Sequence, residues 1–137
     1  MISVPIENLI PHRAPMRFID ALVECTETTA VATATFGAEH FAVANGFVLE
    51  TALVECVAQT AAAALGWRAQ ASGKTGGSNN GMLIAVTNFR IETRPAAGKI
   101  LRIKISERKR LGLMLMISST ITCEEKIIAV GDLTLYA

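Results

Sequence analysis

A long apolar segment from Val48 to Gln70 constrains this chain more than any other feature. Apolar side chains recur there at helical spacing, and alanine, the strongest helix former, is abundant. The segment therefore predicts one long helix over residues 48–70. Because this helix is apolar on nearly every side, we expect it to be buried by an element that wraps around it. The small side chains of Ala61–Ala64 would let a sheet approach closely.

The same segment does not have the composition of a membrane-spanning helix. It carries Glu50, Glu55 and Gln59, and no stretch of the chain reaches the roughly 18 uninterrupted apolar residues that such a helix needs. Residues 1–13 have neither a basic start nor a clean apolar run, so a signal peptide is not expected. We therefore expect a cytoplasmic protein that does not bind a membrane.

The rest of the chain alternates between strand and turn signals. Two strands are predicted within residues 19–36, joined by a turn at Thr26–Thr29, and residues 37–47 are predicted to be a loop. After a polar loop at 71–81, further strands are predicted at 82–92, 99–108, 113–123 and 127–136. We expect a single α+β domain over residues 1–137, with the long helix wrapped by a curved antiparallel sheet.

Composition narrows the classes of function. Hydrophobic residues make up 51% of the chain and charged residues 18%, which excludes a disordered chain. This much apolar surface exceeds what a small monomer can hide, so we expect a dimer or a higher oligomer. The net charge of +1 argues against a nucleic-acid binder. The three cysteines are widely spaced and form no metal-binding pattern, so neither a metal nor a cofactor is expected.

Two side chains are candidates for acid–base chemistry. Glu55 and Gln59 share one face of the predicted helix, and a carboxylate on a buried helix is costly unless it is paired or used. His40 lies in the loop before the helix and, with Glu55, would supply a base and an acid for proton transfer. The simpler alternatives are a carboxylate that faces a neighbouring loop or a subunit seam, and a solvated loop histidine.

The predicted start of the helix is a candidate for binding a developing oxyanion. Backbone N–H groups between Gly46 and Thr51 lie at the positive end of the helix dipole. Glu50 has the simpler interpretation of complementing that dipole. Cys56 is interpreted as a small core residue, and His12 as part of a Pro-His-Arg segment that pins the extended N-terminal chain to the sheet.

Taken in order along the chain, these motifs resemble those of a known enzyme family. Leu9–Met16 followed by Ile19–Asp20, then His40–Phe41, then the Glu55-x-x-Ala58-Gln59 helix motif, are similar to hot-dog-fold 3-hydroxyacyl-(acyl carrier protein) dehydratases. The segments that resemble the remainder of that family are Asn88–Arg90, the Pro95–Gly98 turn and the run Arg108–Arg110.

The resemblance implies a hot-dog fold and a homodimer in which each active site takes His40 from one chain and Glu55 from the other. His40 would remove the C2 proton of a 3-hydroxyacyl thioester, and Glu55 would protonate the departing 3-hydroxyl. The product would be the trans-2-enoyl thioester, and no cofactor would be needed. The residues assigned to substrate binding are Gly46, Glu50, Thr51, Gln59, Asn88 and Phe89.

The chain departs from the family pattern after His40–Phe41. Ala42-Val43 stands where the family has Pro-Gly, and a second Pro-Gly of the family falls on Leu49–Glu50. In this respect the chain is more similar to a divergent branch of predicted dehydratases, some of them found with aryl-polyene-type biosynthesis, so either fatty acid or polyene biosynthesis is expected.

Two other functions stay open. A hot-dog thioesterase would use Glu55 as a base or nucleophile toward the thioester carbonyl. A non-catalytic acyl-binding or partner subunit would bind an acyl group without turnover. For the dehydratase, the expected partner is the acidic acyl carrier protein, steered by basic residues at Arg90, Arg94 and Arg108–Arg110.

Overall fold

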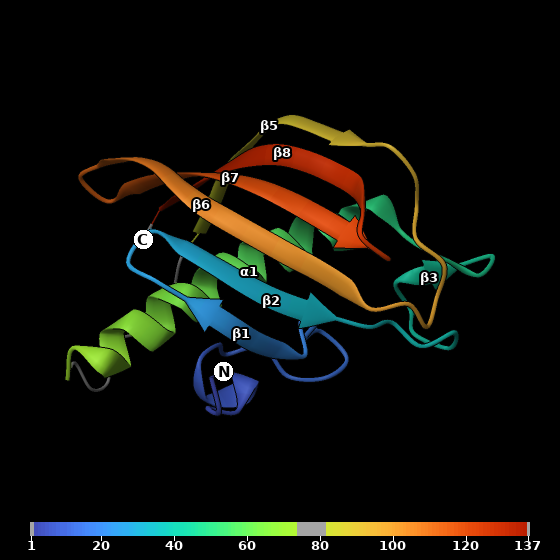
Figure 1. The fold of residues 1–137 in the computed structure, drawn as a ribbon, viewed down its shortest axis with the longest axis horizontal. Helices are drawn as coiled ribbons and strands as arrows, with labels where there is room; N and C mark the ends of the chain where they lie inside the picture. The colour runs from blue at the N-terminus through green and yellow to red at the C-terminus, as the bar shows by residue number, and fades with distance from the viewer. Residues whose placement is uncertain (1, 74–81, 137) are drawn as a thin grey trace.

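The computed structural model describes residues 2–73 and 82–136. Its longest helix, α1, runs from Glu50 to Ala71 and lies behind a curved antiparallel sheet (Figure 1). The expected long helix and the sheet that wraps it are therefore confirmed, with the helix beginning two residues later than predicted. Within the described ranges, no helix is both long enough and apolar enough to cross a membrane.

In the described part of the chain, the sheet has six strands in the order β1-β2-β6-β7-β8-β5, and each neighbouring pair is antiparallel. A single 3-10 turn, η1 (Ile6–Asn8), precedes the strands. The strand bounds are β1 Ala21–Cys25, β2 Thr29–Ala34, β5 Met82–Ile91, β6 Leu101–Leu111, β7 Met114–Cys123 and β8 Lys126–Tyr136. Both β1 and β5 are edge strands, because each pairs on one side only.

Residues 37–47 were expected to be a loop, which is confirmed for 37–42. The prediction was wrong for the residues after them, which form a short hairpin made of β3 (Val43–Ala44) and β4 (Phe47–Val48). Asn45 and Gly46 turn the chain between these strands with φ angles of 55° and 83°. Asn-Gly favours a tight two-residue turn of this kind, because both of its central positions need a positive φ.

Two further segments differ from expectation. Strand β6 continues to Leu111 instead of ending at 108, because Lys109 and Arg110 still pair with β7 after a register shift at Arg108. Most of the loop predicted at 71–81 lies outside the described residues.

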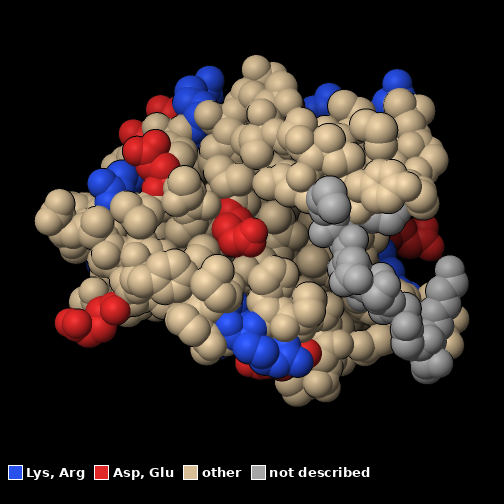
Figure 2. All heavy atoms as spheres, turned by 180° about the vertical axis from the view of Figure 1, so that it is seen from behind, with Lys and Arg blue, Asp and Glu red and all other residues tan. Residues whose placement is uncertain are grey.

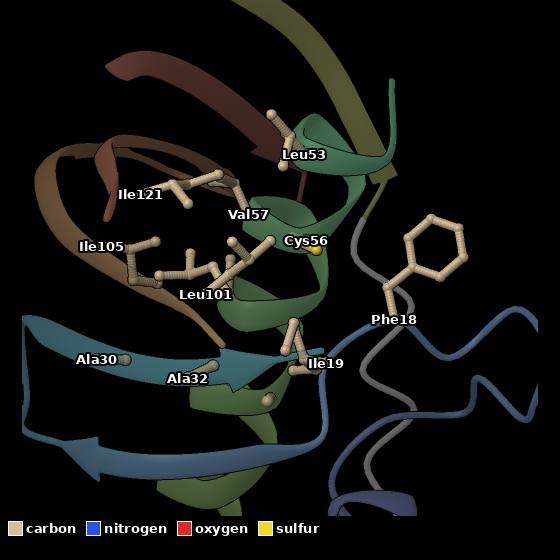
Figure 3. Packing of buried hydrophobic residues seen from close by; sticks show 14 of the residues in the cluster. Phe18, Ile19, Ala30, Ala32, Leu53, Cys56, Val57, Leu101, Ile105 and Ile121 are labelled. Atoms are coloured by element: carbon tan, nitrogen blue, oxygen red, sulfur yellow. The ribbon is translucent and has the colours of Figure 1, made fainter. Parts of the chain in front are cut away.

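The hydrophobic core lies between α1 and the sheet. Leu53 and Val57 of the helix point toward sheet residues that include Leu101, Ile105 and Ile121 (Figure 3). Ala61, Ala63 and Ala64 continue the buried side of the helix. Their small size allows the close approach of the sheet that the sequence indicated.

A second side of α1 is covered by residues 2–20, called the lead below. Ile6, Leu9 and Ile10 belong to the same core cluster as the buried side chains of the helix. The guanidinium of Arg13 donates to the carbonyl oxygens of Ile10 and Glu7, at 2.9 and 3.1 Å. The lead is therefore a folded part of the domain. In the described residues, however, Arg13 bonds to other residues of the lead and not to the sheet, contrary to the expectation for its Pro-His-Arg segment.

A third side of α1 carries Val54, Ala58 and Ala62, which are only half-buried. Figure 2 shows that the face of the molecule opposite the view of Figure 1 is largely uncharged. The chain exposes 7591 Å² in total, against roughly 6,900 Å² for a typical monomer of this mass. Large apolar side chains are among the exposed residues, for example Ile84, Val86 and Ile100.

Gly131 of β8 makes room for Phe89 on the neighbouring strand β5. A Cβ atom added at Gly131 would lie 2.6 Å from the backbone Cα of Phe89, and a backbone atom cannot rotate away. We predict that Gly131→Ala lowers the free energy of unfolding by about 2–3 kcal/mol, as overpacking in a core does. Urea denaturation measures this loss.

Gly37→Ala is the matched control for that variant, because no heavy atom lies within 4 Å of a Cβ at Gly37. Its free energy of unfolding should stay within about 0.5 kcal/mol of the parent, as surface changes usually do. Equal destabilisation by the two substitutions would contradict the packing argument.

Candidate active site

Gln59 links helix α1 to the lead through a fully bonded amide. The residue is 1% exposed. Its Oε1 accepts a hydrogen bond from the backbone N–H of Phe18 at 2.8 Å, and its Nε2 donates to the carbonyl of Met16 at 2.8 Å. A buried amide without such partners would be costly, so this linkage sets where the lead crosses the helix.

Glu55 lies one turn before Gln59 on the same side of α1, as the spacing predicted. The Nε2 of Gln59 donates to its Oε2 at a long 3.4 Å. No other hydrogen bond to the Glu55 carboxylate is made within the described residues, and the side chain is half-buried. One carboxylate oxygen is therefore open to a ligand or to a neighbouring chain.

His40 sits in the turn that follows β2, inside a cage of three aromatic rings. The ring centroids of Phe41, Phe36 and Phe18 lie 4.7, 5.1 and 5.5 Å from that of the imidazole. The Phe41 ring stacks on His40 at 25°, whereas the other two meet it edge-on. The cage fixes the plane of the imidazole and leaves its edges to make polar contacts.

Both ring nitrogens of His40 are hydrogen-bonded. Nδ1 accepts from the backbone N–H of Ala42 at 3.0 Å, and Nε2 lies 3.1 Å from the carbonyl oxygen of Pro15. An amide N–H can only donate and a carbonyl oxygen can only accept. The imidazole is therefore neutral, with its proton on Nε2.

The lead passes between the two candidate groups. His40 holds the carbonyl of Pro15, and Gln59 holds the carbonyl of the next residue, Met16. The structure thus brings His40 and the Glu55–Gln59 pair to neighbouring peptide units of one segment. Sequence reasoning missed Pro15 and Met16 as neighbours of the site, because nothing in the sequence says which loop the lead will meet.

The start of α1 lies close along the chain to this arrangement. Glu50 and Thr51 are exposed in the first turn, and the preceding Leu49 provides no side-chain cap. Their backbone N–H groups make no hydrogen bond in the described part of the chain, so they stay available to an anionic oxygen. Gly46 is at the exposed tip of the β3–β4 hairpin, where its carbonyl accepts from the N–H of Ala97 at 2.9 Å.

Asn88 and Phe89 lie elsewhere, on edge strand β5. Asn88 is exposed with a φ of 54°, within a stretch where the pairing of β5 with β8 shifts register. Phe89 packs against the core. Neither forms a hydrogen bond to His40 or Glu55 in the described ranges, so the structure does not bring them into that arrangement within one chain.

The basic residues expected to attract a carrier protein differ in how many hydrogen bonds and ion pairs they form within the chain. Arg94 donates to the carbonyl oxygens of Val48, Phe47 and Ala44, at 2.9, 3.2 and 3.4 Å, and so clamps the hairpin. Arg90 pairs with Glu92 at 2.9 Å. The exposed run at 108–110 stays the more open of the basic groups.

Neither a thiol nor a metal cluster adds to this chemistry in the described residues. Cys56 is 0% exposed, and burial raises the pKa of its thiol, which disfavours the nucleophilic thiolate. This agrees with its interpretation as a core residue. No group of three or more His, Cys, Asp or Glu side chains comes together as a metal site in residues 2–73 and 82–136.

We predict that Gln59→Leu lowers the free energy of unfolding by about 2–3 kcal/mol, since it leaves a buried N–H and a carbonyl of the lead without partners. The exposed Gln70, whose Nε2 donates to the carbonyl of Asn8 at 2.8 Å, supplies the control Gln70→Leu. Its loss should stay near 0.5 kcal/mol. Thermal and urea unfolding of both variants measures the difference, and similar losses would refute the role of Gln59.

The chain has relatives with which this arrangement can be compared. The ApeP-like family, described as ApeP dehydratase, matches residues 4–137. No protein among the curated sequences matches the chain. The Dehydratase Heterocomplex ApeI:P from Xenorhabdus doucetiae contains a similar chain, with 19% identity and a TM-score of 0.89, covering 98% of this chain and 91% of that one.

Hot-dog proteins of other kinds share the fold at lower similarity. The PaaI protein from the phenylacetic acid degradation operon of E. coli is 16% identical, with a TM-score of 0.67, over 85% of this chain and 81% of that one. A hypothetical thioesterase with coenzyme A from Streptococcus pneumoniae is 12% identical, with a TM-score of 0.65, over 85% and 83%. These likenesses confirm the hot-dog fold. The family match spans nearly the whole sequence, and this chain belongs to the ApeP-like dehydratase family.

Proposed function

We propose that the chain is a cytoplasmic dehydratase that removes water from a 3-hydroxyacyl thioester on acyl carrier protein, in fatty acid or polyene biosynthesis. The product is the trans-2-enoyl thioester. The observation that carries the proposal is a dehydratase-family match in a chain where His40 contacts Pro15 and where Gln59, the hydrogen-bond partner of Glu55, contacts Met16.

Dehydration of such a thioester needs three catalytic functions. A base takes the C2 proton, an acid gives a proton to the departing 3-hydroxyl, and a hydrogen-bond donor stabilises the enolate-like carbonyl oxygen. Glu55 has a free carboxylate oxygen for proton transfer, and His40 carries an N–H at the edge of its cage. The exposed side chains of Met16 and Phe41 supply apolar surface for an acyl chain.

We propose a pair of chains joined along β5 as the active unit. β5 is a ten-residue edge strand with exposed Leu83, Ile84 and Val86. Long apolar edge strands of this kind pair with another chain unless they are protected. The half-buried Val54, Ala58 and Ala62 of α1 would be covered by the same association.

A pair of this kind also accommodates the remaining substrate-binding assignments. Asn88 and Phe89 lie on β5, so pairing would put them at the seam between chains, where each site would combine groups from both. In this proposal the first-turn N–H groups of Glu50 and Thr51, with Gly46 nearby, bind the polar end of the thioester. Gln59 acts by holding Glu55 and the lead in place.

The carrier protein is proposed to approach a basic surface. Arg108 and Lys109 are exposed and form no ion pair within the described residues, whereas Arg110 is 3.7 Å from Glu107. Charges that are not neutralised within the chain can attract an acidic partner over distances of about 10 Å at ordinary ionic strength.

We predict that Glu55→Gln reduces turnover of a 3-hydroxyacyl-carrier thioester by about 10²–10⁴-fold, because the amide cannot transfer the proton. Loss of one water is followed by mass spectrometry, with free thiol measured in the same tube. Glu27→Gln, an exposed change in the β1–β2 turn, is the control and should keep parental turnover.

Two results of that assay would contradict the proposal. Thiol release that depends on Glu55, without loss of water, would make the protein a thioesterase. Binding of the acyl carrier without either reaction would make it a non-catalytic partner subunit.

Ile84→Lys is predicted to convert the assembly to monomers, because a charged side chain on the edge of β5 opposes pairing. Size-exclusion chromatography with light scattering measures the mass. Ile100→Lys is the control, since Ile100 is 67% exposed but lies outside β5, and it should leave the dimer intact. A parent protein that is monomeric at all concentrations would refute the paired unit.

A further inference from the structure

The hydrogen bonds of His40 leave its ring without a free lone pair. Nδ1, the nitrogen that carries the lone pair of the neutral ring, is bonded to the N–H of Ala42 at 3.0 Å. Nε2 carries the proton and points it at the carbonyl oxygen of Pro15, 3.1 Å away. A general base needs an accessible lone pair within reach of the proton that it removes. His40 in this arrangement offers an N–H instead.

The backbone around His40 holds this tautomer in place. The N–H of His40 donates to the carbonyl of Gly37, and its own carbonyl accepts from the N–H of Val43, both at 3.0 Å. Ala42 is 2% exposed, and its carbonyl accepts from the N–H of Leu49 at 2.8 Å. Protonation of Nδ1 would set two N–H groups against each other in this partly buried turn, which is unfavourable.

A flip of the ring does not solve the problem. Turning the imidazole by half a turn would put a carbon atom opposite the N–H of Ala42 and leave that N–H without an acceptor. The surrounding Phe18, Phe36 and Phe41 restrict other rotations, because their centroids lie within 4.7–5.5 Å of the imidazole. The Nε2–H edge of the ring therefore stays turned toward the lead, at the carbonyl oxygen of Pro15.

The carbonyl of Pro15 shows what kind of group this N–H binds. It is an uncharged carbonyl oxygen, as is the oxygen of a thioester. Pro15 and Met16 are both exposed in the lead. A thioester carbonyl that takes the place of the Pro15 oxygen would receive the same hydrogen bond from the same atom.

We propose that His40 acts as a neutral hydrogen-bond donor to the thioester carbonyl and that Glu55 performs both proton transfers; this rests on the function proposed above. A neutral imidazole suits such a role, because it donates a hydrogen bond to a developing oxyanion without giving up its proton. The Glu55 carboxylate removes the C2 proton, and the electrons of the C–H bond form the enolate-like intermediate.

The second step returns the site to its starting state. The enolate electrons form the C2–C3 double bond, the bond between C3 and the hydroxyl oxygen breaks, and Glu55 gives its proton to that oxygen. Water and the enoyl thioester leave, Glu55 is again a carboxylate, and His40 has kept its proton throughout.

Substitutions at His40 distinguish a role as hydrogen-bond donor from a role as general base. His40→Gln places an amide N–H near the position of Nε2 but has no basic lone pair. His40→Asn can accept from the N–H of Ala42 but does not reach the Nε2 position, and His40→Ala supplies neither group. We expect His40→Gln to keep turnover within about tenfold of the parent, while His40→Asn and His40→Ala lose about 10²–10³-fold.

The tautomer is measured without any assumption about function. With ¹⁵N-labelled histidine at pH 7, the His40 spectrum should show a protonated Nε2 and an unprotonated Nδ1. The opposite tautomer would overturn the proposal. So would a folded His40→Gln protein that is as inactive as His40→Ala while the parent turns over, since that result makes His40 the base. A parent that turns over but carries the opposite tautomer refutes the role of His40 alone, whereas a parent without turnover refutes the dehydratase function and the role that rests on it.

Discussion

Helix α1 can exist in water only where each of its sides is covered, because almost every side is apolar. The sheet covers one side through Leu53, Val57 and the small residues after them. The lead covers another through Ile6, Leu9 and Ile10. The third side, with Val54, Ala58 and Ala62, remains half-open in the single chain. The need to bury the apolar sides of α1 thus explains the positions of the sheet and the lead, and it leaves one side of the helix available for association.

The candidate site lies where polar hydrogen bonds join the lead to α1. Gln59 is the polar residue that joins the lead to the helix, and it is also the neighbour of Glu55. His40 holds the peptide before the one held by Gln59. The same few hydrogen bonds therefore hold the lead and position His40 and Glu55. A substitution that breaks them is expected to affect both stability and the positions of these two side chains.

Much of the architecture was predictable from the sequence because its signals are local. The alanine-rich run predicted the helix to within two residues, and alternating apolar residues predicted the strands. The β3–β4 hairpin was missed although Asn45-Gly46 is a strong turn signal, because its strands are only two residues long. The end of β6 was missed because charged residues 108–110 are usually found in turns rather than in a strand.

The candidate site was predictable in its members but not in its geometry. His40 and Glu55 stood out by type and spacing. The partners of His40 include Pro15, 25 residues away, and those of Gln59 include Met16, 43 residues away. Contacts of that span depend on how the lead packs, which no local pattern encodes. Arg94 shows the same limit, since it was interpreted as a contact for a partner and instead clamps the hairpin from 46 to 50 residues away.

The contacts of Arg94 with the β3–β4 hairpin connect edge strand β5 to the turn that carries His40. Strand β5 runs into residues 92–97 with only a short bend. There Arg94, the carbonyl of Pro95 and the N–H of Ala97 bind the hairpin that follows His40. A contact that immobilised β5 would also restrict residues 92–97, and loss of that contact would leave the turn around His40 less firmly held. A shift of β5 would therefore reach the turn that holds His40 through a continuous stretch of backbone.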